Sequence, residues 1–121
     1  MSEQTTLEET ASQTVTALLT ALQNGDAEAY YNLMSHADQE MMDAESIGQS
    51  MREMQQQSGR LQSFKVQGIV LHEAAGHASA HVLMDFELTG QKSDLYNLTR
   101  QGSEWKMDFD LAELMGEDQD V

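Results

Sequence analysis

Apolar residues recur every three or four positions through the first part of the chain, which is the spacing of an amphipathic helix. The repeat consists of Leu7, Ala11, Val15, Leu18 and Leu22. Thr6 and Glu9 match a capping box at its start. The pair Asn24-Gly25 predicts its end, because glycine tolerates the left-handed conformation that follows a helix.

Two further helices are expected before the polarity pattern changes. Asp26 is expected to cap a short second helix, which carries Tyr30 on its apolar side and ends near Ser35. Residues 38–57 show a weaker, methionine-rich repeat, which predicts a third helix ending at Gly59. Methionine fills irregular gaps in cores and also lines adaptable binding surfaces, and core packing is the favoured interpretation here.

From residue 64 onwards the apolar repeat becomes an alternation, which predicts four antiparallel strands joined as a meander. A three-residue loop at Ala74-Ala75-Gly76 would place Glu73 opposite His77 and Lys65 opposite Asp85, two favourable charge pairs. In that register one face of the sheet carries Phe64, Val66, Gly68, Val70 and His72.

The last hairpin has the clearest turn signal. Gly102-Ser103 fits a two-residue type II′ turn, in which glycine supplies the positive φ of the first central position. The resulting pairs are Arg100 with Trp105, Leu98 with Met107 and Tyr96 with Phe109. Gly90-Gln91-Lys92 is expected to join the two hairpins. The predicted fold is therefore α+β, with three N-terminal helices packed on a curved four-stranded antiparallel sheet.

Composition adds limits on domains, compartment and partners. The 121 residues fit one domain, 1–121, with a disordered tail at about 115–121. There is no cysteine, and no apolar run approaches the ~20 residues of a membrane-spanning helix. The chain is expected to be soluble, cytoplasmic as given, or periplasmic or lipid-anchored if a signal segment was removed. A net charge of −15 argues against nucleic-acid partners and favours a solvated surface over a dedicated site for a basic partner.

This order of elements resembles the nuclear-transport-factor-2-like superfamily, also described as SnoaL-like or cystatin-like. The resemblance rests on ALLTALQNGDAEAYYNLMS, a helix, Gly-Asp, helix unit, and on NLTRQGSEWKMDFD, a closing strand pair. It covers about residues 7–111 and is nearest to small uncharacterised bacterial domains. The resemblance implies a cone between sheet and helices, and dimers that pair through their sheets.

The segment HEAAGHASAH, residues 72–81, contains three of the four histidines. His77 follows His72 by five residues, which does not match the zinc-protease motif. On a strand, His77 and His81 would share a face but stand ~13 Å apart, too far to hold one ion. Ser79 is expected on the polar face with no base beside it. No metal and no cofactor is predicted.

The polar groups on the predicted inner face mark a candidate ligand pocket at Tyr30, His72, Tyr96 and Arg100. No Asp or Glu of the strands falls on that face, so the carboxylate base that the resemblance implies for isomerase and cyclase members has no counterpart. Buried tyrosines and an Arg100 stacked on Trp105 are the structural alternative.

These observations favour a non-enzymatic binding domain that holds a small apolar or amphipathic ligand between sheet and helices. An isomerase or hydrolase using His72 and Tyr96 is the alternative, and a structural homodimeric subunit without ligand is a third. A homodimer is expected through the outer face of the sheet, where the register places four aliphatic residues, namely Ile69, Leu71, Leu83 and Leu95.

Overall fold

The computed structural model describes residues 3–72, 76–102 and 104–109, with side chains from residue 7 onwards, and every structural statement below concerns these residues. The helices are α1 (Glu3–Asn24), α2 (Ala27–Asn32), α3 (His36–Met41) and α4 (Ala44–Ser58). The strands are β1 (Leu61–Leu71), β2 (His77–Phe86), β3 (Gly90–Gln101) and β4 (Glu104–Met107). The tail predicted at about 115–121 lies outside the described residues.

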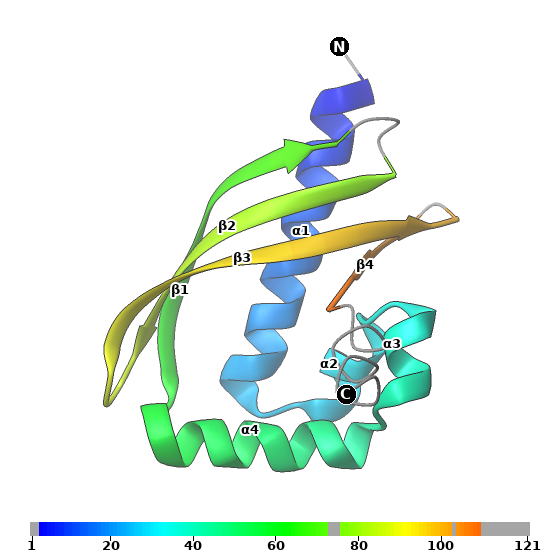
Figure 1. Ribbon diagram of the computed structural model, residues 1–121. Coiled ribbons are helices and arrows are strands. Elements are labelled where there is room, and N and C mark those ends of the chain that lie inside the picture. The colour runs from blue at the N-terminus through cyan, green and yellow to red at the C-terminus, as the bar shows by residue number, and fades with distance from the viewer. Residues whose placement is uncertain (1–2, 73–75, 103, 110–121) are drawn as a thin grey trace, which may run out of the picture.

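The four strands form one antiparallel sheet in the order β1-β2-β3-β4. The sheet curves around α1, and α4 runs across the end of α1 before the chain enters β1 (Figure 1). The predicted α+β class, with helices packed on an open four-stranded sheet, is therefore confirmed. The helices number four among the described residues, one more than expected.

Local capping explains the helix boundaries. α1 begins at Glu3, so Thr6 is not its cap, because the preceding polar residues continue the helix without any apolar signal. Asp26 caps α2 as predicted, its Oδ1 accepting the Ala29 N–H at 3.1 Å. Gly25, with φ of +69°, ends the first helix.

The segment predicted as a third helix is divided in two. Ser35 caps α3 by accepting the Asp38 N–H at 3.2 Å, and Asp43 caps α4 by accepting the Ser46 N–H at 2.8 Å. The hydrogen bonds from Ser46 hold the pKa of the Asp43 carboxyl below its ordinary value. Such side-chain caps compete with helix continuation. Gly59 follows α4 with φ of +81°, as the sequence indicated.

The register of the first hairpin differs from the prediction. Lys65 lies opposite Leu83 rather than Asp85, and Phe64 lies opposite Met84. An irregularity between Val66 and Gly68 then shifts the register. A β-bulge lets the apolar residues before and after it face the same side. Burial of these side chains outweighs an exposed cross-strand charge pair, which contributes only ~0.2 to 1 kcal/mol.

The shift reverses the faces of the second half of β1. Ile69 and Leu71 lie opposite Ala80 and Ala78 and pack against the core, not on the outer face. Val70, predicted to face inward, is 52% exposed.

Of the loop predicted at Ala74-Ala75-Gly76, the structure describes only Gly76. Ala74 and Ala75 lie outside the described residues, as does Glu73. The His72 N–H donates to the His77 carbonyl at 2.9 Å, which places His72 opposite His77, where Glu73 was expected.

The turn of the second hairpin differs from the prediction, whereas the pairs of the third hairpin agree with it. Phe86 pairs with Gly90, so Gly90, Gln91 and Lys92 belong to β3 and residues 87–89 form the connection. In the last hairpin the pairs Arg100 with Trp105 and Leu98 with Met107 are confirmed. Gly102 has a φ of +66° as that turn requires, whereas Ser103 lies outside the described residues.

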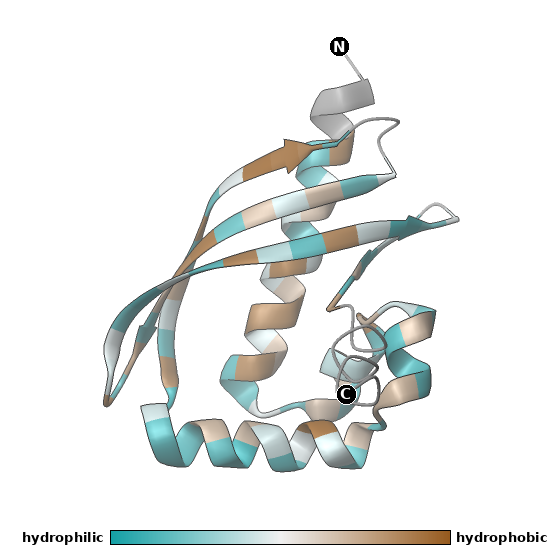
Figure 2. Cartoon of the chain, viewed as in Figure 1, coloured by the Kyte–Doolittle hydropathy of each residue, from teal (hydrophilic) through white to brown (hydrophobic). Residues whose placement is uncertain are grey.

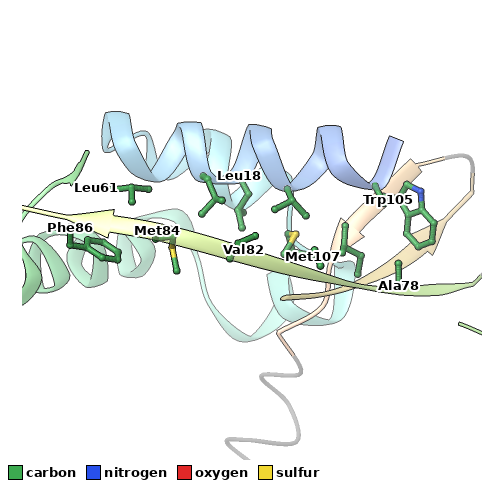
Figure 3. Packing of buried hydrophobic residues seen from close by; sticks show 13 residues of the cluster. Leu18, Leu61, Ala78, Val82, Met84, Phe86, Trp105 and Met107 are labelled. Carbon is green, nitrogen blue, oxygen red and sulfur yellow. The ribbon is translucent and has the colours of Figure 1, made fainter. Parts of the chain in front are cut away.

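The core lies between α1 and the inner face of the sheet. Leu18 of α1 faces Val82 and Met84 of β2 across the interior, and Trp105 closes the end near the start of α1 (Figure 3). Apolar bands recur along α1 and along the strands, and β1 ends in a continuous apolar stretch (Figure 2). Trp105 Nε1 donates to Thr10 Oγ1 at 3.1 Å, which satisfies its buried donor.

The free edge of β4 is attached to the helical part of the chain. Met107 donates its N–H to the Leu33 carbonyl at 2.7 Å and accepts the Ser35 N–H at 2.8 Å. These bonds bring the segment after β4 against the helices, where the candidate site lies. None of the helices in the described part of the chain is long and apolar enough to cross a membrane.

Candidate ligand-binding site

An apolar cavity of about 280 Å³ lies among the helices. Four methionines form much of its wall, namely Met34, Met42, Met51 and Met54, together with Leu22 of α1 and Ile47 of α4. Tyr30, Ser50 and Phe109 complete the lining. Methionine side chains adapt to ligands of different shape because they are unbranched and polarisable.

This position corrects the expected pocket between sheet and helices. The space between α1 and the sheet is filled by side chains that are completely buried, such as Leu18, Val82 and Leu98. Met51 and Met54 of residues 38–57 pack in the core as predicted, and they also line the cavity.

Two rings of an aromatic cluster, those of Tyr30 and Phe109, line one side of the cavity. The Tyr30 ring stacks on Phe109, with centroids 5.9 Å apart and planes 6° from parallel. The Tyr96 ring meets Phe109 edge-on, with centroids 6.4 Å apart. Asp38 positions Phe109, because its Oδ2 accepts the Phe109 N–H at 2.6 Å.

Both tyrosine hydroxyls of the cluster are held in the protonated form. Burial raises the pKa of Tyr96 to about 12, and the Asp94 carboxylate adds to the effect. Burial raises the pKa of Tyr30 as well, with Tyr96 and Asp94 contributing. Tyrosine is protonated at neutral pH in any case, and the raised pKa extends this state to more alkaline solutions. The Tyr96 hydroxyl makes a long contact of 3.7 Å to the sulfur of Met84.

Asp94 corrects the expectation that the inner face carries no acidic residue. It pairs with the buried Val82 of β2 and precedes Tyr96 by two residues, so both lie on the inner face. The alternation that turns Tyr96 inward also turns Asp94 inward, because side chains two residues apart on a strand share a face.

Two of the four predicted pocket residues are brought together. Tyr30 and Tyr96 meet through Phe109. Arg100 lies four residues further along β3, roughly 13 Å away at the usual rise per residue. Its guanidinium lies 5.8 Å from the centre of the Trp105 ring, and its Nε has no acceptor among the described residues. Arg100 is therefore separate from the cavity.

His72 belongs to the outer face of the sheet. Its Nε2 lies 2.7 Å from the Ser79 hydroxyl, which donates to Asn97 Oδ1 at 3.1 Å. Ser79 thus has a histidine beside it, contrary to expectation. Which of the His72 ring and the Ser79 hydroxyl donates in this contact depends on the tautomer of the histidine. The trio satisfies polar groups of the sheet. Among the described residues, no three metal-ligating side chains gather closely enough to hold an ion.

Sequence reasoning missed the residues that hold the cavity together across the chain. Phe109 was assigned only as the partner of Tyr96, and Asp38 only as the start of a helix. The sequence contained a partial signal for each residue. Phe109 is an apolar residue just after a strand, Asp38 is an acid near a helix start, and each requires a partner if it is buried. The pairing of residues 71 positions apart is visible only in the fold.

Comparisons with known proteins identify the fold. Neither protein-family models nor curated proteins match this sequence. Among solved structures, an NTF2-like transpeptidase from Campylobacter jejuni superposes with a TM-score of 0.61 and 14% identity, covering 81% of this chain and 97% of that one. The chain therefore has the nuclear-transport-factor-2-like fold that its sequence resembles.

Two proteins that contain a SEC-C motif share the same architecture. The one from Psychrobacter arcticus has a TM-score of 0.65 and 15% identity, covering 83% of this chain and 59% of its own length. The one from Rhodopseudomonas palustris has a TM-score of 0.56 and 13% identity, covering 74% of this chain and 67% of its own. At these identities the likeness concerns the fold alone.

Proposed function

We propose that this protein is a binding domain that holds a small apolar or amphipathic molecule in the methionine-lined cavity. The observation that carries the proposal is the cavity itself, whose volume of about 280 Å³ and apolar wall are close to the lower range of small-molecule sites. An apolar space of this size gains little from water, because water there has few hydrogen-bond partners.

The polar groups of the cavity support a ligand with one polar end. Tyr30 and Ser50 are the residues of the described wall that carry hydroxyl groups. A few polar groups in an apolar pocket orient a ligand without dominating its affinity.

An isomerase or hydrolase that uses His72 with Tyr96 is not supported by the geometry. His72 contacts Ser79 on the outer face, whereas Tyr96 packs with Phe109 on the inner side. The two side chains lie on opposite faces of one sheet and cannot act on the same substrate.

Ligand binding is expected to stabilise the protein and to depend on the open volume beside Ser50. Saturation with a neutral apolar probe such as 1-octanol, at about 100 times its Kd, stabilises by about 2.7 kcal/mol and raises Tm on the order of 5 to 10 °C. Ser50→Trp places an indole in the cavity and is expected to remove the shift. Thermal unfolding with and without the alcohol provides the measurement.

Gln49→Trp is the matched control, because Gln49 is the exposed neighbour of Ser50 on α4 and does not line the cavity. It is expected to retain the full shift. If the native protein shows no shift, or if both tryptophan variants lose it equally, the cavity is not a binding site and the structural-subunit hypothesis takes its place.

We further propose that the outer face of the sheet pairs two copies of the chain. Val70 and Leu95 are 52% and 48% exposed on that face. Leu83 lies on the same face of β2, two residues after the His81 that pairs with Leu95. Val70, Leu83 and Leu95 thus replace the originally expected set, in which Ile69 and Leu71 belong to the core. Clustered exposed aliphatic residues are typical of an association surface.

The proposed dimer is expected to strengthen with salt and to depend on Leu83. A charge of −15 per chain opposes association most at low ionic strength, where screening is weakest. Sedimentation of the native protein at low and high salt is expected to show more dimer at high salt, and Leu83→Lys is expected to be monomeric. A native protein that stays monomeric throughout, or a dimer unaffected by Leu83→Lys, would refute this interface.

A further inference from the structure

The described wall of the cavity contains no charged side chain. No lysine or arginine is among the described residues of its wall. The Asp38 carboxylate holds Phe109 from the side of α3, and Asp94 lies on the inner face two residues before Tyr96. The whole chain carries a net charge of −15, which raises the local concentration of cations and lowers that of anions.

The nearest arginine of α4 serves a different space. Arg52 lines a smaller neighbouring cavity of about 150 Å³, which shares Leu22, Met51 and Met54 with the first. Tyr30 and Phe109 do not line that second cavity. Arg52 is therefore not at the aromatic end of the larger cavity, and Lys92, which lies opposite Met84 two residues before Asp94, does not line that cavity either.

Aromatic rings beside a carboxylate recognise organic cations. The ring faces carry negative charge density, and a cation within ~6 Å of a ring centre is attracted to it, more strongly when it is removed from water. Tyr30, Phe109 and Tyr96 form three neighbouring rings, with centroid spacings of 5.9 and 6.4 Å. A buried anionic head group would instead meet no compensating positive charge, which makes its transfer from water costly.

We propose that the cavity selects an amphipathic cation, with its apolar chain among the methionines and its ammonium head at the rings of Tyr30 and Phe109, on the side where Phe109 meets Tyr96. This inference rests on the proposed binding function and specifies the class of ligand. Asp94 is then a specificity-determining residue that acts on the head group from outside the wall, because neither Asp94 nor Tyr96 lines the cavity. The raised pKa of Tyr96 agrees with a negative charge near the ring.

The test compares three probes that share an eight-carbon chain: octyltrimethylammonium, 1-octanol and octyl sulfate. Calorimetric titration is carried out on the full chain, far below the micelle concentrations and in about 0.3 M salt, where the Debye length is below ~8 Å. We expect the ammonium probe to bind about tenfold more tightly than the alcohol, and the sulfate to bind more weakly than both.

Asp94→Asn is expected to bring the affinities of the ammonium probe and the alcohol to within about twofold of each other, because the rings remain but the charge is lost. The substitution preserves an oxygen that can accept the Leu95 N–H, which Asp94 Oδ1 now accepts at 2.9 Å. The control is Asp85→Asn, which removes the same charge from β2 opposite Ser63 and Gln91 and is expected to leave the preference unchanged. Unfolding midpoints verify that both variants are folded.

The outcomes separate the ligand class from the binding function. Equal affinities for the ammonium probe and the alcohol would overturn the cation preference and leave the binding function in place. A similar loss in both aspartate variants would assign the preference to surface charge and would also overturn it. If none of the three probes binds, the proposed function itself fails.

Discussion

Replacing Asp38 by alanine is expected to lower the free energy of unfolding by about 3 kcal/mol, since a charge-assisted hydrogen bond is lost and a buried donor is left without a partner. The Asp38 side chain is 1% exposed, and its carboxylate accepts the Phe109 N–H at 2.6 Å. This bond fastens the chain after β4 to α3. Urea unfolding followed by circular dichroism measures the change.

Glu40→Ala is the matched control for this prediction. Glu40 lies on the same short helix and is exposed, so its replacement is expected to change stability by less than about 0.5 kcal/mol. Equal effects of the two substitutions would show that Asp38 acts only through the stability of the helix, and the proposed link to Phe109 would be wrong.

Leu98→Ala is expected to lower the free energy of unfolding by about 2 to 5 kcal/mol, which is the range for a large side chain deleted from a packed core. Leu98 is completely buried, pairs with Met107 across the last hairpin and lies in the core cluster with α1. Chemical denaturation of the native protein and the variant measures this change. The m-value, which is the slope of the unfolding free energy against denaturant concentration, should be the same for both, because a changed slope would indicate an altered unfolded or native ensemble.

Leu95→Ala, three residues earlier on β3, tests the assignment of faces. Leu95 is 48% exposed on the outer face, so the same deletion leaves no cavity and is expected to cost less than about 1 kcal/mol in the monomer. A large loss at Leu95 with a small one at Leu98 would mean that the sheet presents the opposite face to α1. The comparison is made at low salt and low protein concentration, where association contributes least.

The local signals in the sequence predicted the parts of the fold that local chemistry controls. Gly25 and Asp26 marked the boundary between α1 and α2, because a left-handed glycine and a side-chain acceptor act within a few residues. The last hairpin was predicted pair by pair at Arg100 and Leu98, since a two-residue turn with glycine sets a register by itself. The resemblance to the nuclear-transport-factor-2-like fold rested on these same segments.

The register of β1 and the candidate site depended on the tertiary structure. The bulge after Val66 exchanged the faces of Ile69 and Val70, because burial against α1 decides which side chains turn inward and no local turn signal encodes it. The cavity formed where Phe109 meets Tyr30, a contact between residues from opposite ends of the chain. The sequence by itself determined the elements and their order, whereas the packing of α4 and the bond from Asp38 to Phe109 decided where the open space and its aromatic end lie, since both depend on contacts between residues far apart in the chain.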